Sequence, residues 1–184
     1  MENEIAEIAL KVVHNAVGRI VYCSVPITTG PRYFEWLKKG GDSDNITEKR
    51  KEIIVPNIRH ARKTINQIRE LLRCPVIDPT TIENVDAYNR NWTEEQFYEF
   101  WDIVIQNAVS EIVFLDGWNF STGCSNELLS AILGNKPIFY QNYSPMKIGD
   151  AVNMVEQGLN QFKEFGLENQ GLEIVYKKLI ELSD

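Results

Sequence analysis

EIVFLDGWNFSTGCSNELLSAILGNKPIFY, residues 111–140, contains two short apolar runs separated by a polar loop and a helical pattern. The runs at 112–115 and 138–140 are rich in branched and aromatic residues, as is typical of strands covered on both faces. Between them, four apolar residues recur at helical spacing: Leu128, Leu129, Ile132 and Leu133. The stretch therefore predicts a strand, a helix and a second strand parallel to the first.

The helix is expected to begin at Ser121 or Thr122, which are good N-cap residues, and to end at Gly134. The loop before it leaves the first strand at the carboxyl edge of a parallel sheet, where such folds bind their ligands. The mouth of a pocket is therefore expected at five loop residues: Asp116, Gly117, Trp118, Asn119 and Ser121. The positive end of the helix dipole points there too, which favours an anion such as phosphate.

Two further residues of this helix bear on chemistry. Gly123 lacks a Cβ, so a ligand can approach the backbone closely. Glu127 follows about one turn later, and the helix dipole is expected to keep it ionised. An ionised carboxylate beside a sugar-phosphate site indicates attack on, or stabilisation of, an electron-poor carbon. The plainer alternative is that Ser121 only caps the helix and Glu127 only complements its dipole.

Three motifs carry a resemblance to the nucleoside 2-deoxyribosyltransferase-like superfamily. STGCSNELLSAILGNKPI (121–138) resembles its signature, in which a Ser or Asp, a Gly and then a Glu open a helix that ends in a Gly-Lys-Pro turn. The superfamily includes nucleoside 5′-monophosphate N-glycosidases, and LDGWNFSTG (115–123) resembles the version of the motif found in its uncharacterised, often phage-encoded members. RIVYCSVPITTG (19–30) is similar to the family's first strand and following loop.

The resemblance implies roles for several residues. Glu127 would be the nucleophile, and Tyr22 would orient it through its hydroxyl group. The sugar or phosphate would be held by three residues of the first loop: Thr28, Thr29 and Gly30. An acid on the helix before the third strand is matched by Asp102, offset by one residue, and would help to protonate the departing base.

One departure from the family pattern concerns the substrate. The transferases carry an Asp six positions before the nucleophile, where this chain has Ser121. In the relatives that hydrolyse nucleoside 5′-monophosphates, a Ser at that position binds the phosphate. The resemblance thus favours nucleotides over free nucleosides, and Arg32 is a convenient cation for the phosphate.

The expected activity is cleavage or transfer of the N-glycosidic bond of a nucleotide or (deoxy)nucleoside, with Glu127 attacking C1′ and the base released, without a metal or cofactor. Water as acceptor gives a hydrolase, and a second base gives a transferase. NAD is a further possible substrate. The rival hypothesis is a non-catalytic nucleotide-binding sensor or defence-related module. The transferases pair, so a homodimer is expected, with Asn142 and Tyr143 contributing to a neighbouring pocket.

The composition of the chain limits which classes of protein it can belong to. The chain has 184 residues, 43% hydrophobic and 24% charged, which fits one globular domain spanning 1–184. A net charge of −7 argues against nucleic-acid binding. No segment reaches the roughly 20 apolar residues of a membrane span. The three cysteines, Cys23, Cys74 and Cys124, suit free thiols in the cytoplasm, and no spacing indicates a metal site.

The predicted fold is a single α/β domain with a doubly wound, mostly parallel sheet, Rossmann-like or flavodoxin-like, and helices on both faces. The remaining elements are expected as a helix at 5–17, strands at 19–24 and 74–77, a helix at 46–73 that Pro56 kinks or divides in two, a helix at 94–109 with a Thr93/Gln96 capping box, and helices at 148–165 and 172–182.

Other segments are candidates for pocket contacts. The aromatic run at 33–36 either stacks on a base or packs in the core, with neither favoured. The glycine-rich segment at 38–45 is expected to be a mobile loop that closes over the pocket. A long loop at 78–92 offers base or ribose contacts or is a connecting insertion, and its candidates are Asp86, Tyr88, Asn89 and Arg90. Phe97 and Trp101 are expected on the core face of their helix.

Overall fold

A computed structural model describes residues 7, 8, 11, 18–84 and 92–183. At its centre are four parallel strands in the order β2-β1-β3-β4. The strands are β1 (Val21–Ser24), β2 (Val76–Ile77), β3 (Glu111–Phe114) and β4 (Ile138–Tyr140). The chain winds outward in opposite directions from the β1/β3 pair, which makes this pair the topological switch point. The predicted α/β fold is confirmed, with β1 and β2 shorter than expected.

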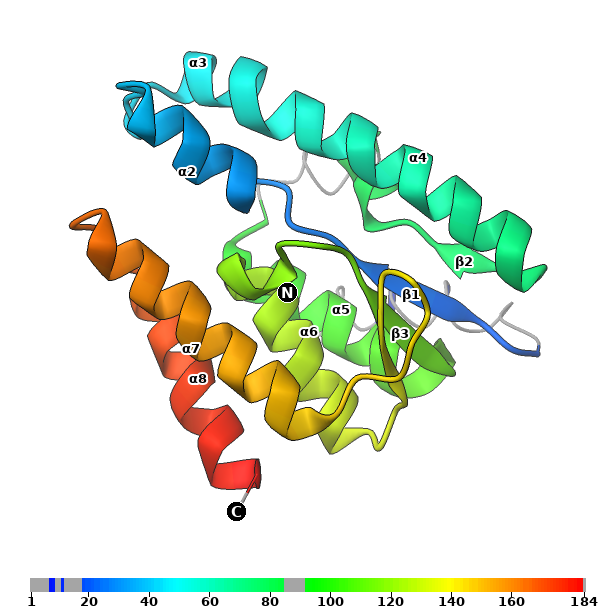
Figure 1. Ribbon diagram of the computed structural model, residues 1–184. Coiled ribbons are helices and arrows are strands. Elements are labelled where there is room, and N and C mark those ends of the chain that lie inside the picture. Colours follow the sequence, from blue (N-terminus) through cyan, green and yellow to red (C-terminus); the bar gives the residue numbers. More distant parts are fainter. Residues whose placement is uncertain (1–6, 9–10, 12–17, 85–91, 184) are drawn as a thin grey trace.

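Helices cover both faces of the sheet (Figure 1). One face carries α4 (Val55–Leu72), whose buried residues pack on odd-numbered strand residues such as Cys23 and Val113. The other face carries α5 (Glu94–Ala108) and α6 (Thr122–Leu133). Because side chains alternate along a strand, even-numbered residues such as Tyr22 belong to this second face.

The last two helices complete the larger layer. They are α7 (Ile148–Glu164) and α8 (Gln170–Ser183), close to the predicted bounds, and both lie on the α6 side of the sheet. The capping box predicted for α5 is confirmed: the Thr93 hydroxyl accepts from the Gln96 backbone N–H, and the Gln96 side chain accepts from the Thr93 backbone N–H. These contacts fix where α5 begins.

The predicted helix at 46–73 is divided, as expected from Pro56. It consists of α3 (Ile46–Lys49), a π-helical turn η1 (Arg50–Ile54) and α4. Proline has no N–H to donate to the preceding turn, and the widened turn lies directly before it. Asn45 caps α3 by accepting a 3.1 Å hydrogen bond from the Glu48 N–H.

In the chain, α2 (Pro31–Lys38) lies between β1 and α3. Two short 3₁₀ helices follow strands: η2 (Pro79–Asn84) comes after β2, and η3 (Trp118–Phe120) comes after β3. The segment after α2 folds back on that helix, with the Gly41 N–H bonded to the Trp36 carbonyl. It does not line either of the cavities described below.

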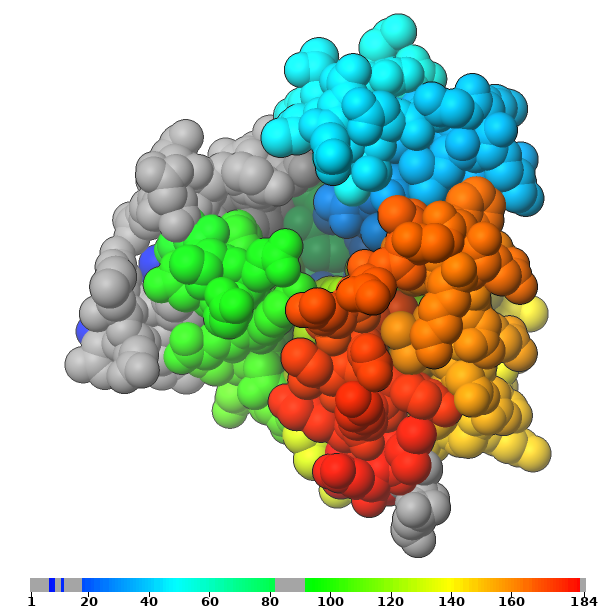
Figure 2. All heavy atoms as spheres, turned by 90° about the vertical axis from the view of Figure 1, so that its left-hand side faces the viewer, coloured from blue at the N-terminus to red at the C-terminus, as the bar shows by residue number. Residues whose placement is uncertain are grey.

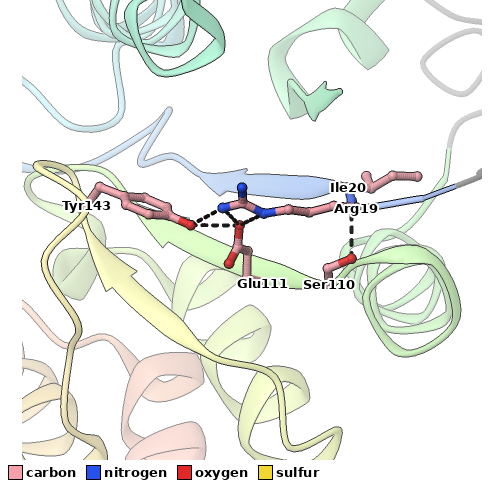
Figure 3. A network of polar contacts seen from close by, with 5 residues as sticks. All are labelled: Arg19, Ile20, Ser110, Glu111 and Tyr143. Carbon is pink, nitrogen blue, oxygen red and sulfur yellow. Dashed lines mark hydrogen bonds and ion pairs between the residues drawn. The ribbon is translucent and has the colours of Figure 1, made fainter. Parts of the chain in front are cut away.

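A polar network joins β1, β3 and the segment after β4 (Figure 3). Arg19 Nε donates to Glu111 Oε1 at 2.7 Å, and the Tyr143 hydroxyl donates to the same oxygen at 2.8 Å. The Tyr143 ring stacks on Phe139, with ring centroids 4.4 Å apart. The Tyr143 side chain is therefore held by hydrogen bonding and ring stacking within its own chain.

The loops that leave β1 and β3 touch at the switch point. Gly117 has a φ of 83°, and a Cβ there would lie 2.5 Å from Cδ of Pro31. Gly30 also has a positive φ, of 98°. Glycine is therefore required at 117 for two reasons, backbone conformation and space. The contact separates the space at this edge into two parts.

Some expectations fall on parts of the chain that are not described. The N-terminal helix at 5–17 lies outside the described residues, apart from residues 7, 8 and 11, and so do Asp86, Tyr88, Asn89 and Arg90. Within the described ranges, no helix combines the length and the apolar character needed to cross a membrane.

Gly117→Ala is expected to lower the free energy of unfolding by about 2 kcal/mol or more, because it adds a clash to an unfavourable φ. Urea denaturation measures the change. Gly149→Ala is the control, since nothing lies within 4 Å of a Cβ at this position in α7, and its effect should be about zero or stabilising. Equal effects of the two substitutions would contradict the close contact of the loops.

Candidate active site

Glu127 connects α6 to the central strand. It lies in the second turn of α6, and its Oε1 accepts a 2.5 Å hydrogen bond from the Tyr22 hydroxyl on β1. Tyr22 is fully buried, and its ring lies against Trp101 of α5, with centroids 5.1 Å apart. The structure thus contains the hydrogen bond that the resemblance implies.

A cavity of about 240 Å³ opens at the carboxyl edge of the sheet beside Glu127. We call it the Glu127 cavity. Three parts of the chain form its walls. Ile27 and Thr28 come from the β1 loop, Ser121 and Gly123 come from the start of α6, and the third wall is one side of α5. Figure 2 looks onto this edge and shows the surface hollowed between α5, in green, and α2 and α3, in blue to cyan.

Burial governs the charge of Glu127. Its Oε2 is inaccessible to solvent and has no hydrogen-bond partner among the described residues. Burial raises the pKa of Glu127 from 4.5 to about 7, and the hydroxyl groups of Ser24 and Tyr22 only partly oppose this rise. The prediction that the helix dipole keeps Glu127 fully ionised was therefore wrong, because loss of solvation outweighs the dipole at this depth.

Ser24 lies at the same site for a simple reason of strand geometry. It follows Tyr22 by two residues on β1, so both side chains are on the α6 face. Ser24 is fully buried, and its hydroxyl makes no hydrogen bond of normal geometry to a described residue. It nevertheless lies close enough to Glu127 to lower the pKa of that carboxyl group. Sequence reasoning missed Ser24, although the period of the strand after Tyr22 indicated it.

Asp102 lines the same cavity, where it is held by a neighbour of Glu127. The Ser130 hydroxyl donates a 2.5 Å hydrogen bond to Asp102 Oδ1. Ser130 follows Glu127 by three residues, so the two side chains lie on one face of α6, about 4.5 Å apart along the axis. Asp102, which is exposed to solvent, and Glu127, whose carboxyl group is buried, therefore line the same cavity from two different helices.

The aromatic wall of the cavity does not come from the run at 33–36. Tyr33, Phe34 and Trp36 are at most 9% exposed and pack in the core. The wall is formed by α5, through Phe97, Tyr98 and Trp101. Phe97 and Trp101 were predicted on the core face of α5. Trp101 does pack against the core, and both rings also line the Glu127 cavity.

The polar lining of the Glu127 cavity is acidic. Among the lining residues that the structure describes are Glu94, Asp102 and Glu127, and none is Lys, Arg or His. Ser121 caps α6 by accepting a 3.4 Å hydrogen bond from the Cys124 N–H. A Cβ on Gly123 would meet only ordinary contacts of 3.7 and 3.8 Å, so open space adjoins this backbone.

The remaining predicted site residues do not join Glu127. Thr29, Gly30, Arg32 and Asp116 line a second cavity of about 190 Å³ on the α4 side of the loop contact. The sequence placed all of them in one pocket, and this was wrong because Gly117 and Pro31 close the crevice between the loops.

Trp118 is also misplaced by the sequence reasoning. It is 1% exposed and packs on Phe114, with ring centroids 4.7 Å apart, and it lines neither cavity. The turn η3 carries its side chain inward beneath the loop rather than toward the pocket mouth. Asn119 is buried as well, and its amide donates to the Met154 carbonyl of α7 at 2.9 Å.

Comparisons with known protein families, with curated proteins and with solved structures find no match to this chain. Over the described residues, no group of three or more His, Cys, Asp or Glu side chains is arranged to hold a metal ion. The chemistry of the site must therefore be argued from its own side chains.

Glu127→Gln is expected to stabilise the protein at alkaline pH. The folded-state pKa of Glu127 is about 7, above its ordinary 4.5, so the native protein holds the proton longer and loses stability as the pH rises between these values. Removing the acid removes this loss. The variant should gain up to about 3 kcal/mol over the wild type at pH 8 and almost nothing at pH 4.

Urea denaturation across pH 4–8 measures this difference. The control is Glu181→Gln, an exposed acid of α8, which should leave the pH dependence unchanged. A Glu127→Gln variant that follows the wild-type curve at all pH values would show that the Glu127 carboxyl group is solvated.

Proposed function

We propose that the protein cleaves, or transfers, the N-glycosidic bond of a nucleoside or nucleotide, with Glu127 as the nucleophile. One observation carries the proposal: the Glu127 carboxyl group, held by Tyr22 at 2.5 Å, lines an aromatic-walled cavity on the carboxyl edge of the sheet, and its second oxygen has no hydrogen-bond partner among the described residues. The resemblance of residues 19–30 and 121–138 to the nucleoside 2-deoxyribosyltransferase-like superfamily supports it.

The proposed reaction has two steps. In the first, ionised Glu127 forms a bond to C1′ of the sugar while the bond from C1′ to the base nitrogen breaks, and the base leaves with that electron pair. In the second, water attacks C1′ and gives its proton to the Asp102 carboxylate, the ester bond to Glu127 breaks, and the Glu127 carboxylate is regenerated. A second base in place of water makes the same sequence a transfer.

Two neighbouring groups serve this reaction. Tyr22 holds Glu127 in place and, as a hydrogen-bond donor, favours its charged form. Asp102, anchored by Ser130, lies in the same cavity, where its protonated form would supply the proton that the leaving base takes up. The rings of Phe97 and Trp101 offer surfaces on which a base can stack.

The charge of the cavity favours a neutral nucleoside over a nucleotide. Its described lining includes three carboxyl groups and no basic side chain, and Ser121 already accepts a hydrogen bond as helix cap. Arg32, the cation expected from the sequence, lines the other cavity. Among the described lining residues, a phosphate in this cavity would therefore be held mainly by the free N–H groups at the start of α6 rather than by the Ser121 side chain.

A second candidate is a nucleoside- or nucleotide-binding module without turnover. A Glu127 pKa near 7 favours it, because about half of these carboxyl groups are protonated at neutral pH and a protonated acid is a poor nucleophile. The homodimer and the cytoplasmic location expected from the sequence also remain proposals.

The activity is tested by incubating the protein with nucleosides, nucleoside 5′-monophosphates and NAD and measuring the released base by chromatography. Base release from at least one substrate is expected, with nucleosides faster than their monophosphates. Glu127→Gln should lower the rate by about a thousandfold or more. Release that is unchanged in this variant excludes Glu127 as the nucleophile, and no release together with a higher melting temperature supports the binding module.

Tyr22→Phe separates positioning from chemistry. The Tyr22 hydroxyl stabilises the charged form of Glu127, so its loss should raise the pKa of Glu127 and move the acidic limb of the pH–rate profile to higher pH. Base release at pH 7 should fall by about tenfold and recover in part at pH 9. Tyr140→Phe, on the outer strand β4, is the control and should leave the acidic limb in place.

A further inference from the structure

The second cavity, on the α4 side of the sheet edge, is distinct from the Glu127 cavity. Adjacent residues of the β1 loop face different cavities: Thr28 lines the Glu127 cavity, and Thr29 lines the second cavity. The floor of the second cavity is apolar, from Leu115 and Ala61. Its volume of about 190 Å³ is below the roughly 300 Å³ of pockets for drug-sized ligands, so only a smaller molecule fits.

A positively charged side chain is fixed at this cavity. Arg32 Nε donates a 3.2 Å hydrogen bond to Asn57 Oδ1. Asn57 in turn donates to the carbonyl groups of Ile27 and Thr29 at 3.0 and 2.9 Å, so it ties the β1 loop to α4. One nitrogen of the guanidinium is thereby anchored. The other two make no hydrogen bond to a described residue, and such a fork suits a phosphate or carboxylate.

Two further features of the cavity lack a partner. Thr29 Oγ1 has no solvent exposure and no hydrogen bond to a described residue. An unmade hydrogen bond of this kind costs stability, and a ligand supplies the missing acceptor when a small shift of the β1 loop exposes the hydroxyl to the cavity. The helix α2 also begins at the cavity with no side-chain cap, because its N-cap is Gly30. Its positive end therefore faces the same space as Arg32.

The charges around the cavity are mixed. His60 of α4 adds a second side chain that can donate, and Asp116 of the β3 loop adds one carboxylate. Asp116 lowers the affinity for a bare anion, which Arg32 still attracts, whereas a molecule with an anionic group at one end and a hydroxyl or amine at the other satisfies both ends and binds more tightly.

We propose that the second cavity binds a small molecule carrying a phosphate or carboxylate group, held by Arg32, His60 and the Thr29 hydroxyl, with Asp116 accepting a hydrogen bond from the rest of the ligand. The site is separate from Glu127 and does not depend on the activity proposed above. The ligand binds whether or not the protein cleaves a glycosidic bond.

Titration calorimetry with inorganic phosphate, and separately with acetate, tests the site and distinguishes the two anions. Wild-type protein should bind at least one of them with a measurable dissociation constant. Arg32→Ala should weaken that binding by about tenfold or more. The matched control is Arg59→Ala, which removes the same charge from α4 next to His60 but lines a different cavity, and it should change binding less than twofold.

Thr29→Val is a second variant, with a side chain of nearly the same shape. It removes only the unpaired hydroxyl, so the free protein should become more stable while the bound anion loses a donor and binds about fivefold more weakly. The His60 imidazole resonances, assigned with His60→Gln, should shift on titration, and Glu127→Gln should bind as the wild type does. Three outcomes would overturn the proposal: no binding of either anion, equal loss in the Arg32 and Arg59 variants, or loss of binding in Glu127→Gln.

Discussion

The hydrogen bond between Tyr22 and Glu127 is the contact on which the site depends. Each group is costly to bury alone, since a phenol and a carboxyl group both lose their water. Paired at 2.5 Å, the Tyr22 hydroxyl and Glu127 Oε1 satisfy each other and join the central strand to α6, and only Oε2 lacks a partner among the described residues. Burial also raises the pKa of the Tyr22 hydroxyl, which ensures that it remains a donor. The position of the acid relative to the sheet is therefore set by the core itself.

The same burial that positions Glu127 also weakens it as a base and nucleophile at neutral pH. Its pKa of about 7 results from lost solvation, opposed by two hydroxyl groups rather than by a cation. This balance is sensitive, because one donor added or removed changes the ionised fraction over the physiological range. Proteins commonly place functional carboxyl groups in this range by such means.

The sequence predicted the fold well because its periodic signals are local. The apolar runs of β3 and β4, the Thr93/Gln96 capping box and the proline at 56 each determine structure within a few residues. The site was predicted only in part. Tyr22 and Glu127 were paired correctly by resemblance, but Arg32 and Trp118 were assigned to the wrong surroundings. Their placement depends on how two distant loops meet at Gly117, and no local pattern encodes that contact.

The β1 loop is a common wall between two chambers, with Thr28 facing one and Thr29 facing the other. Asn57 clamps this wall to α4 through two carbonyl groups. An insertion or deletion here would reshape both chambers at once, so evolution cannot enlarge one for a bulkier guest without altering the other. The shapes of the two chambers are therefore coupled through this single loop.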